Sequence, residues 1–168
     1  ADLEGRLLDR AERHGQLVEL VLGAQVDVGH GEAVVELGVA QRLHQLRQLL
    51  EPTAVELAVQ RATDEDLAEI QLAHDRLEAA LANSDPVHWY RLNAAWHLRL
   101  CEAARAPILV GFIQRLWTGP FPSIAIRLRA VPSSGEHDAI MEAVNERDHV
   151  QAGKLMRAHL EHATSIVM

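Results

Sequence analysis

Residues 42–66 read RLHQLRQLLEPTAVELAVQRATDED, and this stretch decides the fold class. Its apolar residues recur at the spacing of one helix face up to about Ala62. Pro52 interrupts the run, so we expect a kink or a restart there. Thr63 and Asp66 have the spacing of a capping box, which predicts the start of a further helix. The apolar positions of the first run are Leu43, Leu46, Leu49, Leu50, Val55, Leu57 and Ala58.

Helical patterns continue on both sides of this stretch. Pro86 and Pro107 suit the first turns of two more helices, and Asp148 is a candidate cap for the last one. Gly38 is expected to break any long element before Arg42. The expected helices cover residues 3–22, 42–62, 63–81, 86–104, 107–117, 123–130, 135–146 and 150–166. The fold class is therefore all-α, an antiparallel bundle of about six to seven helices joined by short loops.

Composition agrees with a helical protein and limits its function. The 168 residues suffice for one domain with an additional segment, and 48% are hydrophobic but only 4% aromatic. The formal net charge of −8 argues against strong DNA binding by this chain alone, because DNA affinity comes largely from Lys and Arg. Cys101 is the single cysteine, which excludes a disulfide framework and a thiolate zinc site and fits a cytoplasmic protein. There is no apolar run long enough to predict a membrane span.

Histidine is frequent, with ten residues, and three of these lie among apolar neighbours on expected helices: His97, His137 and His159. Asn93 precedes His97 by four residues, so both side chains lie on one helix face. The helices of His137 and His159 are joined near Asp148 and can bring these imidazoles together. Solvated faces are expected for His14, His30, His44, His74, His88, His149 and His162.

Three imidazoles and one amide oxygen form a ligand set for a divalent transition metal, with Zn²⁺ or Ni²⁺ favoured and Mn²⁺ or Fe²⁺ also compatible. On an octahedral ion two positions would remain for water or a bidentate carboxylate. The plain alternative is that each histidine makes an ordinary hydrogen bond in the core.

Four stretches carry a resemblance to a known family. Leu46–Pro52, Asn93–His97, Glu136–Ile140 and Met156–Leu160 resemble, in order and spacing, motifs of the FCD domain. This domain is the C-terminal sensor of the FadR subfamily of GntR transcription regulators. The resemblance implies a helical bundle around a pocket, a small organic acid as effector, and a divalent metal on Asn93, His97, His137 and His159.

Three residues are candidates for effector binding. Arg47 either clamps a carboxylate in the pocket or pairs with Glu51 one helical turn on. Arg127, followed by Arg129, either reaches an anionic ligand or lies solvated at a helix end. Trp96 is expected in the core and pocket wall.

The resemblance covers residues 42–168, and we assign these to the effector-binding domain. Residues 1–41 are too few for the winged helix-turn-helix of GntR regulators, although Val34–Ala40 resembles its turn, so we expect a remnant of that domain or a linker. A second departure is Arg105-Ala106, where the family often has Gly-Asn.

We therefore expect a metal-containing, organic-acid-sensing domain of a DNA-binding regulator, acting as a homodimer and not as an enzyme. One alternative is a stand-alone binding module without DNA binding. A metal-dependent enzyme is the other, but Glu136 and Asp138 flank His137 on different faces and neither is a convincing general base.

Overall fold

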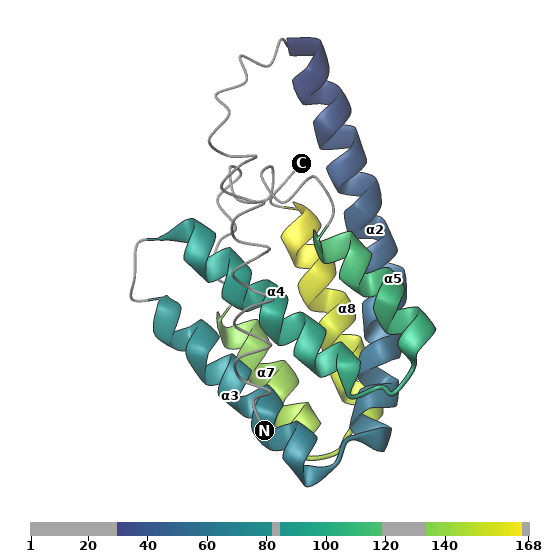
Figure 1. The fold of residues 1–168 in the computed structure, drawn as a ribbon, viewed down its shortest axis with the longest axis vertical. Coiled ribbons are helices and arrows are strands. Elements are labelled where there is room, and N and C mark those ends of the chain that lie inside the picture. The colour runs from purple at the N-terminus through teal and green to yellow at the C-terminus, as the bar shows by residue number, and fades with distance from the viewer. Residues whose placement is uncertain (1–29, 82–84, 119–133, 166–168) are drawn as a thin grey trace.

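The computed structural model describes residues 30–81, 85–118 and 134–165, and every regular element within them is a helix. Six helices form a bundle (Figure 1), which confirms the expected all-α class. The predicted helices at 3–22 and 123–130 lie outside the described residues, as does Arg127. The helices are α2 (His30–Arg61), α3 (Asp64–Ala80), α4 (Pro86–Glu102), α5 (Pro107–Thr118), α7 (Ser134–Asn145) and α8 (His149–Ser165).

Local capping explains where several helices begin. The predicted capping box is present, since Asp66 donates its backbone N–H to Thr63 Oγ1 and accepts from the Thr63 backbone. Asp85 caps α4 by accepting from the backbone N–H groups of Val87 and His88, each at 3.0 Å. Asp148 accepts from the backbone of Gln151 at 2.9 Å. Each cap satisfies amide groups that the first helical turn leaves unpaired.

Helix α2 is longer than its sequence indicates, so the expected break at Gly38 and restart at Pro52 are both wrong. Pro52 has no N–H to donate to the carbonyl oxygen of Gln48, four residues before it. Arg157 of α8 donates to that oxygen from Nη1 at 3.4 Å and so replaces part of the lost interaction. A single helix therefore crosses the expected boundary between residues 41 and 42.

The long helix α2 lies beside α8 and also contacts α4 and α5, while α3 packs on α4 and α7 (Figure 1). Helices α2 and α8 approach closely at Gly153, where a Cβ atom would lie 2.5 Å from Glu56 Cγ. The largest fully buried side chains come from every described helix and include Val55, Ile70, Leu77, Trp96, Leu100, Ile113, Ile140, Met156 and Leu160. Within the described residues, no helix combines the length and apolar character needed to cross a bilayer.

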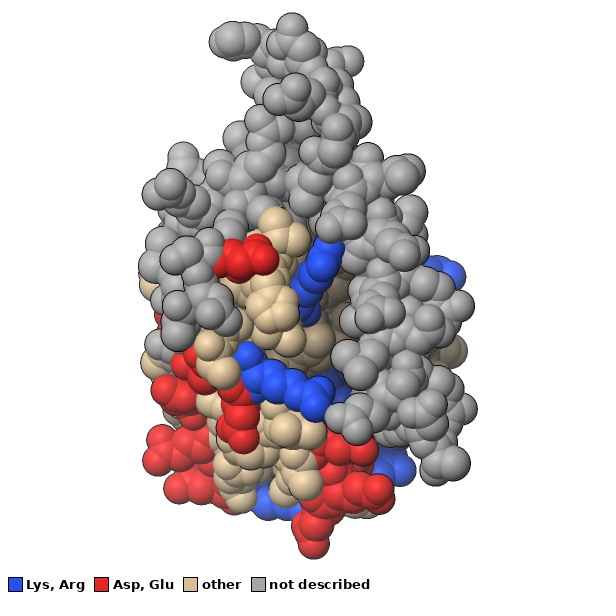
Figure 2. Space-filling view, turned by 60° about the vertical axis from the view of Figure 1, so that its left-hand side comes forward, with Lys and Arg blue, Asp and Glu red and all other residues tan. Residues whose placement is uncertain are grey.

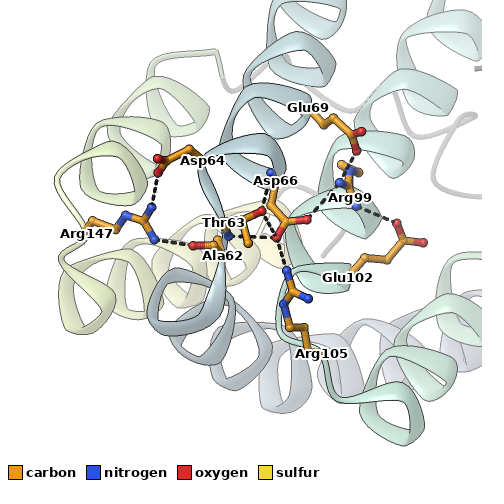
Figure 3. A network of polar contacts seen from close by, with 9 residues as sticks. All are labelled: Ala62, Thr63, Asp64, Asp66, Glu69, Arg99, Glu102, Arg105 and Arg147. Carbon is orange, nitrogen blue, oxygen red and sulfur yellow. Dashed lines mark hydrogen bonds and ion pairs between the residues drawn. The ribbon is translucent and has the colours of Figure 1, made fainter. Parts of the chain in front are cut away.

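A network of hydrogen bonds and ion pairs links the helices at the end of the bundle where α3 begins and α4 ends (Figure 3). Asp66 binds Arg99 and, at 2.8 Å, Arg105. Arg147 donates to the carbonyl oxygen of Ala62 at 2.6 Å and to Asp64. Arg105 and Arg147 have φ angles of 50° and 59°, in the left-handed region that favours glycine. Arg105 therefore adopts the turn conformation that glycine favours, and its side chain adds a bond to α3.

Candidate metal centre

Three imidazoles from three helices meet in the core. His97 of α4, His137 of α7 and His159 of α8 each place one ring nitrogen within 4.8 Å of the others. His97 Nε2 and His159 Nε2 are 3.3 Å apart, and the rings of His137 and His159 have centroids 4.7 Å apart. Their exposures of 0%, 1% and 5% place all three in the interior.

Carboxylates fix the orientation of two of these rings and lie near the third. His97 Nδ1 lies 2.8 Å from Glu51 Oε2, and His159 Nδ1 lies 2.8 Å from Glu136 Oε2. His137 Nδ1 is 3.9 Å from Glu78 Oε1. Because an ionised carboxylate only accepts, the Nδ1 atoms of His97 and His159 donate and their Nε2 atoms carry lone pairs in the neutral ring.

Two lone pairs that face each other at 3.3 Å repel unless a proton or a cation lies between them. Two nitrogens bound to a tetrahedral Zn²⁺ at about 2.0–2.1 Å are roughly 3.4 Å apart, so the observed spacing fits a shared ion. Carboxylates that hold the outer nitrogen of histidine ligands are the usual second layer of such centres.

Two buried atoms of the predicted ligand residues lack hydrogen-bond partners. His137 Nε2 and Asn93 Oδ1 are buried and make no hydrogen bond within the described part of the chain. Asn93 lies one turn before His97 on α4 and is 8% exposed. Buried polar atoms are normally paired, and both atoms are metal-ligand types. The four residues therefore fit a divalent ion in donor chemistry and in their unmet bonding capacity.

The histidines are held in the neutral form that binds metal. Burial lowers the pKa of His97 to about 4 and, with the neighbouring His97 and His159, lowers the pKa of His137 to about 2. Burial also lowers the pKa of His159, against the opposing effect of Glu136.

Glu51 is the centre of a buried network behind His97. Its exposure is 0%, and besides His97 it accepts from Arg47 Nε at 2.6 Å and from Trp117 Nε1 at 3.0 Å. Burial would raise the pKa of Glu51, but the charges of Arg47 and His97 lower it to about 2. The carboxylate is therefore ionised throughout the physiological range.

The candidate effector residues have different surroundings. Arg47 makes the ion pair with Glu51 that its spacing allows, and its guanidinium carbon lies 3.5 Å from the ring centroid of Trp117. Trp96 is 0% exposed, with its ring centroid 4.8 Å from that of His97 and 4.7 Å from that of His137. Trp96 thus forms one wall of the histidine cluster, and the role of both residues in effector binding stays a prediction.

The sequence interpretation of the other histidines is partly wrong. His74 was expected on a solvated face but is 6% exposed, because Trp96 and helix α7 cover it. His44 is half-buried and lies 2.7 Å from the carbonyl oxygen of Leu160. His88 and His162 are exposed as expected, and His149 is half-buried. The side chains of His14 and His30 lie outside the described residues. No local pattern marked Glu51 or Glu136 as partners of the cluster.

Acid should destabilise the metal-free protein well before its carboxylates titrate. The pKa of His44 is lowered to about 4 by burial and Arg47, and that of His97 to about 4 by burial, both from 6.5. The unfolded chain therefore binds more protons than the native chain between about pH 6.5 and 4. Stability is fully present above pH 6.5 and is lost as the pH falls through this window.

Thermal unfolding of the metal-free protein at pH 7, 6, 5 and 4 measures this loss. His44→Gln should make the decline shallower, whereas His88→Gln, a change at an exposed histidine, should leave the slope as it is. A melting temperature that is flat from pH 7 to 4 would contradict the assignment of neutral buried histidines.

Comparison with known proteins identifies the family. Residues 42–162 match the FCD domain. The chain belongs to the FCD domain family. The resemblance of the four motifs to the FCD domain is thereby confirmed.

Two curated relatives agree with this assignment. The chain is 28% identical over 152 residues to the HTH-type transcriptional regulator McbR of Escherichia coli K12. The aligned region covers 86% of this chain and 63% of that protein. It is 28% identical over 130 residues to the Uxu operon regulator of Haemophilus influenzae, covering 71% of this chain and 48% of the relative. These homologues are transcriptional regulators and not enzymes, as expected. The chain thus spans about half to two thirds of their length.

Solved structures match the fold. GntR of Streptococcus agalactiae superimposes with a TM-score of 0.63 at 25% identity, over 73% of this chain and 56% of that one. E. coli McbR/YncC gives a TM-score of 0.66 at 22% identity, over 83% of this chain and 66% of that one. The helical architecture described above is therefore FCD-like.

Proposed function

We propose that this FCD domain senses a small organic acid through a divalent transition metal held by Asn93, His97, His137 and His159. The observation that carries the proposal is the convergence of the three imidazoles within 4.8 Å in the buried core. Zn²⁺ or Ni²⁺ suits three nitrogen donors and one amide oxygen best, and Mn²⁺ or Fe²⁺ remains compatible.

The charge of such a centre explains why its effector would be an anion. Neutral imidazoles and an amide do not neutralise a divalent ion, so a bound metal supplies a localised positive charge inside the bundle. A carboxylate is attracted to that charge and is a ligand of these metals. Arg47 adds a guanidinium in the adjoining Glu51 network, Trp96 supplies a wall, and Arg127 is a further candidate contact.

Helix α2 offers a route from the metal centre to the preceding segment. Glu51 on α2 holds His97 of the centre, and α2 extends from there toward His30, beyond the rest of the bundle (Figure 1). We propose that residues 42–168 are the sensor and that residues 1–41 are a remnant of the winged domain or a linker. A change at the centre would then reach the N-terminal segment through one continuous helix.

DNA and a second protomer are proposed partners of the whole regulator. The net charge of −8 argues against strong DNA binding by this chain alone. On the face shown in Figure 2, acidic side chains gather on the left and in the lower part, and basic ones lie in the middle and near the lower edge. This charge distribution also favours the alternative of a stand-alone binding module, and a gel shift with the full chain separates the two.

Calorimetric titration with acetate, succinate and citrate tests the sensing role. The protein loaded with Zn²⁺ or Ni²⁺ should bind at least one of these carboxylates at least tenfold more tightly than the metal-free protein. Chloride at equal ionic strength is the control for a general anion effect. Equal affinity with and without metal, or no heat with any carboxylate, would contradict a metal-based anion receptor.

A further inference from the structure

A second group of metal-ligand side chains lies on the other side of His137, between α3 and α7. His74 and Glu78 of α3 and Asp138 of α7 each place one ligand atom within 4.8 Å of the others. We propose that these residues bind a second divalent cation, separate from the histidine triad.

Unmet bonding capacity at two buried atoms is the first argument. His74 is 6% exposed, and its Nε2 atom is buried without a hydrogen bond to any described residue. Glu78 Oε1 is likewise buried and makes no such bond. Polar atoms buried in this way are rare in folded proteins, and a cation between them would satisfy both.

An imidazolium at His74 is the ordinary alternative explanation of this cluster. Its Nε2–H would then donate to Asp138, whose Oδ1 is 3.2 Å from Nε2. The two atoms are close enough, but their alignment makes no hydrogen bond. A neutral imidazole that directs its lone pair at a cation, with the carboxylates of Glu78 and Asp138 around the same ion, accounts for both the distance and the missing bond.

The ligand set indicates the class of ion. His74 and Glu78 are four residues apart and so lie on one face of α3, which gives one nitrogen and one oxygen donor. Asp138 supplies a second carboxylate from the opposite helix, and its side chain is 62% exposed, so water completes the coordination. One imidazole and two carboxylates suit Mn²⁺ or Zn²⁺. The partial exposure of this site makes it the weaker of the two.

The two centres adjoin each other through neighbouring residues. His137 directly precedes Asp138, and its Nδ1 atom is 3.9 Å from Glu78 Oε1. The ring of Trp96 lies between the centres, with its centroid 6.1 Å from that of His74 and 4.7 Å from that of His137. An ion that takes Glu78 alters the surroundings of His137, so occupancy of one centre shifts the affinity of the other, and the effect is reciprocal.

Asp138→Asn tests the second site, because this exposed side chain can change without disturbing the core. Equilibrium dialysis of the metal-free full chain against Zn²⁺, followed by elemental analysis, counts the bound ions. The parent should bind one more ion per chain than Asp138→Asn. The affinity of this site for Zn²⁺ should fall at least about 10–100-fold in the variant, because changing even a neighbour of a metal ligand lowers metal affinity by that factor.

Glu142→Gln is the matched control, since it removes the same charge from an exposed residue one turn further along α7 and should bind as many ions as the parent. Equal counts in the parent and Asp138→Asn overturn the second site. The difference between the two proteins is one ion whether or not the triad binds metal. If the triad binds none, the parent should bind one ion per chain and Asp138→Asn none. If the triad binds one, the parent should bind two and Asp138→Asn one.

Discussion

Replacing His159 with alanine is expected to remove the metal that the protein retains after gel filtration. His159 contributes one of three converging nitrogens, and its Nε2 atom is 3.3 Å from that of His97. The remaining two imidazoles and Asn93 form an incomplete set on one side of the ion. Elemental analysis should therefore find stoichiometric metal in the parent and almost none in the variant, and His137→Ala should behave in the same way.

The control is His162→Ala, which changes the same residue type on the same helix. His162 also contacts Glu136, with Nδ1 2.5 Å from Oε1, but it is exposed and lies outside the triad. Its loss should leave the metal content unchanged. Equal metal in the parent and in His159→Ala would show that the triad is not the metal site.

Thermal stability gives a second measure of the same change. A ligand that binds only the folded state stabilises it by about 2.7 kcal/mol when its free concentration is a hundred times Kd. Added Zn²⁺ or Ni²⁺ should raise the melting temperature of the parent and of His162→Ala by several degrees. The melting temperature of His159→Ala should rise less, because only the weaker second site is left to bind the ion.

Glu51→Gln is expected to be the most destabilising isosteric change in the described core. Glu51 is fully buried and accepts from Arg47, His97 and Trp117 at 2.6–3.0 Å. The amide cannot balance the guanidinium charge, and its N–H₂ group faces donors instead of acceptors. Breaking a buried ion pair by removing one partner costs about 3–5 kcal/mol, so chemical denaturation of the metal-free protein should show a loss of this size.

The same variant should also bind metal about 10–100-fold more weakly, because Glu51 orients His97 from its outer nitrogen. Glu56→Gln is the matched control, at a half-buried position on the same helix that does not contact His97. It should change stability and metal content little. If both variants unfold at the same denaturant concentration, the Glu51 network contributes no special stability.

Local sequence signals predicted helix starts and the alignment of ligands within a helix. The Thr63 and Asp66 box and the cap at Asp148 are present where their spacing placed them, and α4 begins at Pro86 as expected. These interactions span three or four residues, so a short stretch of sequence contains both partners. Asn93 and His97 share a face of α4 for the same reason. Apolar spacing and the positions of proline predicted the remaining helices.

Contacts between distant segments could not be predicted in this way. Helix α2 continues through Pro52, and the carbonyl oxygen of Gln48 that proline leaves unpaired accepts from Arg157, 109 positions further along the chain. His74 is buried because Trp96 and α7 cover it, although its own neighbours in α3 indicate a solvated face. The predicted restart at Pro52 and the predicted exposure of His74 were wrong because the residues that contact these positions are far away in the sequence.

By itself, the sequence determined that the chain is helical, where most described helices begin, and that His97, His137 and His159 face inward, because helix period and end caps are local properties. Only the tertiary structure decided that three of those imidazoles come within 4.8 Å of one another and that Glu51, Glu78 and Glu136 lie behind or beside them. The packing of α2, α4, α7 and α8 sets these distances, and packing depends on side chains that are far apart in the sequence.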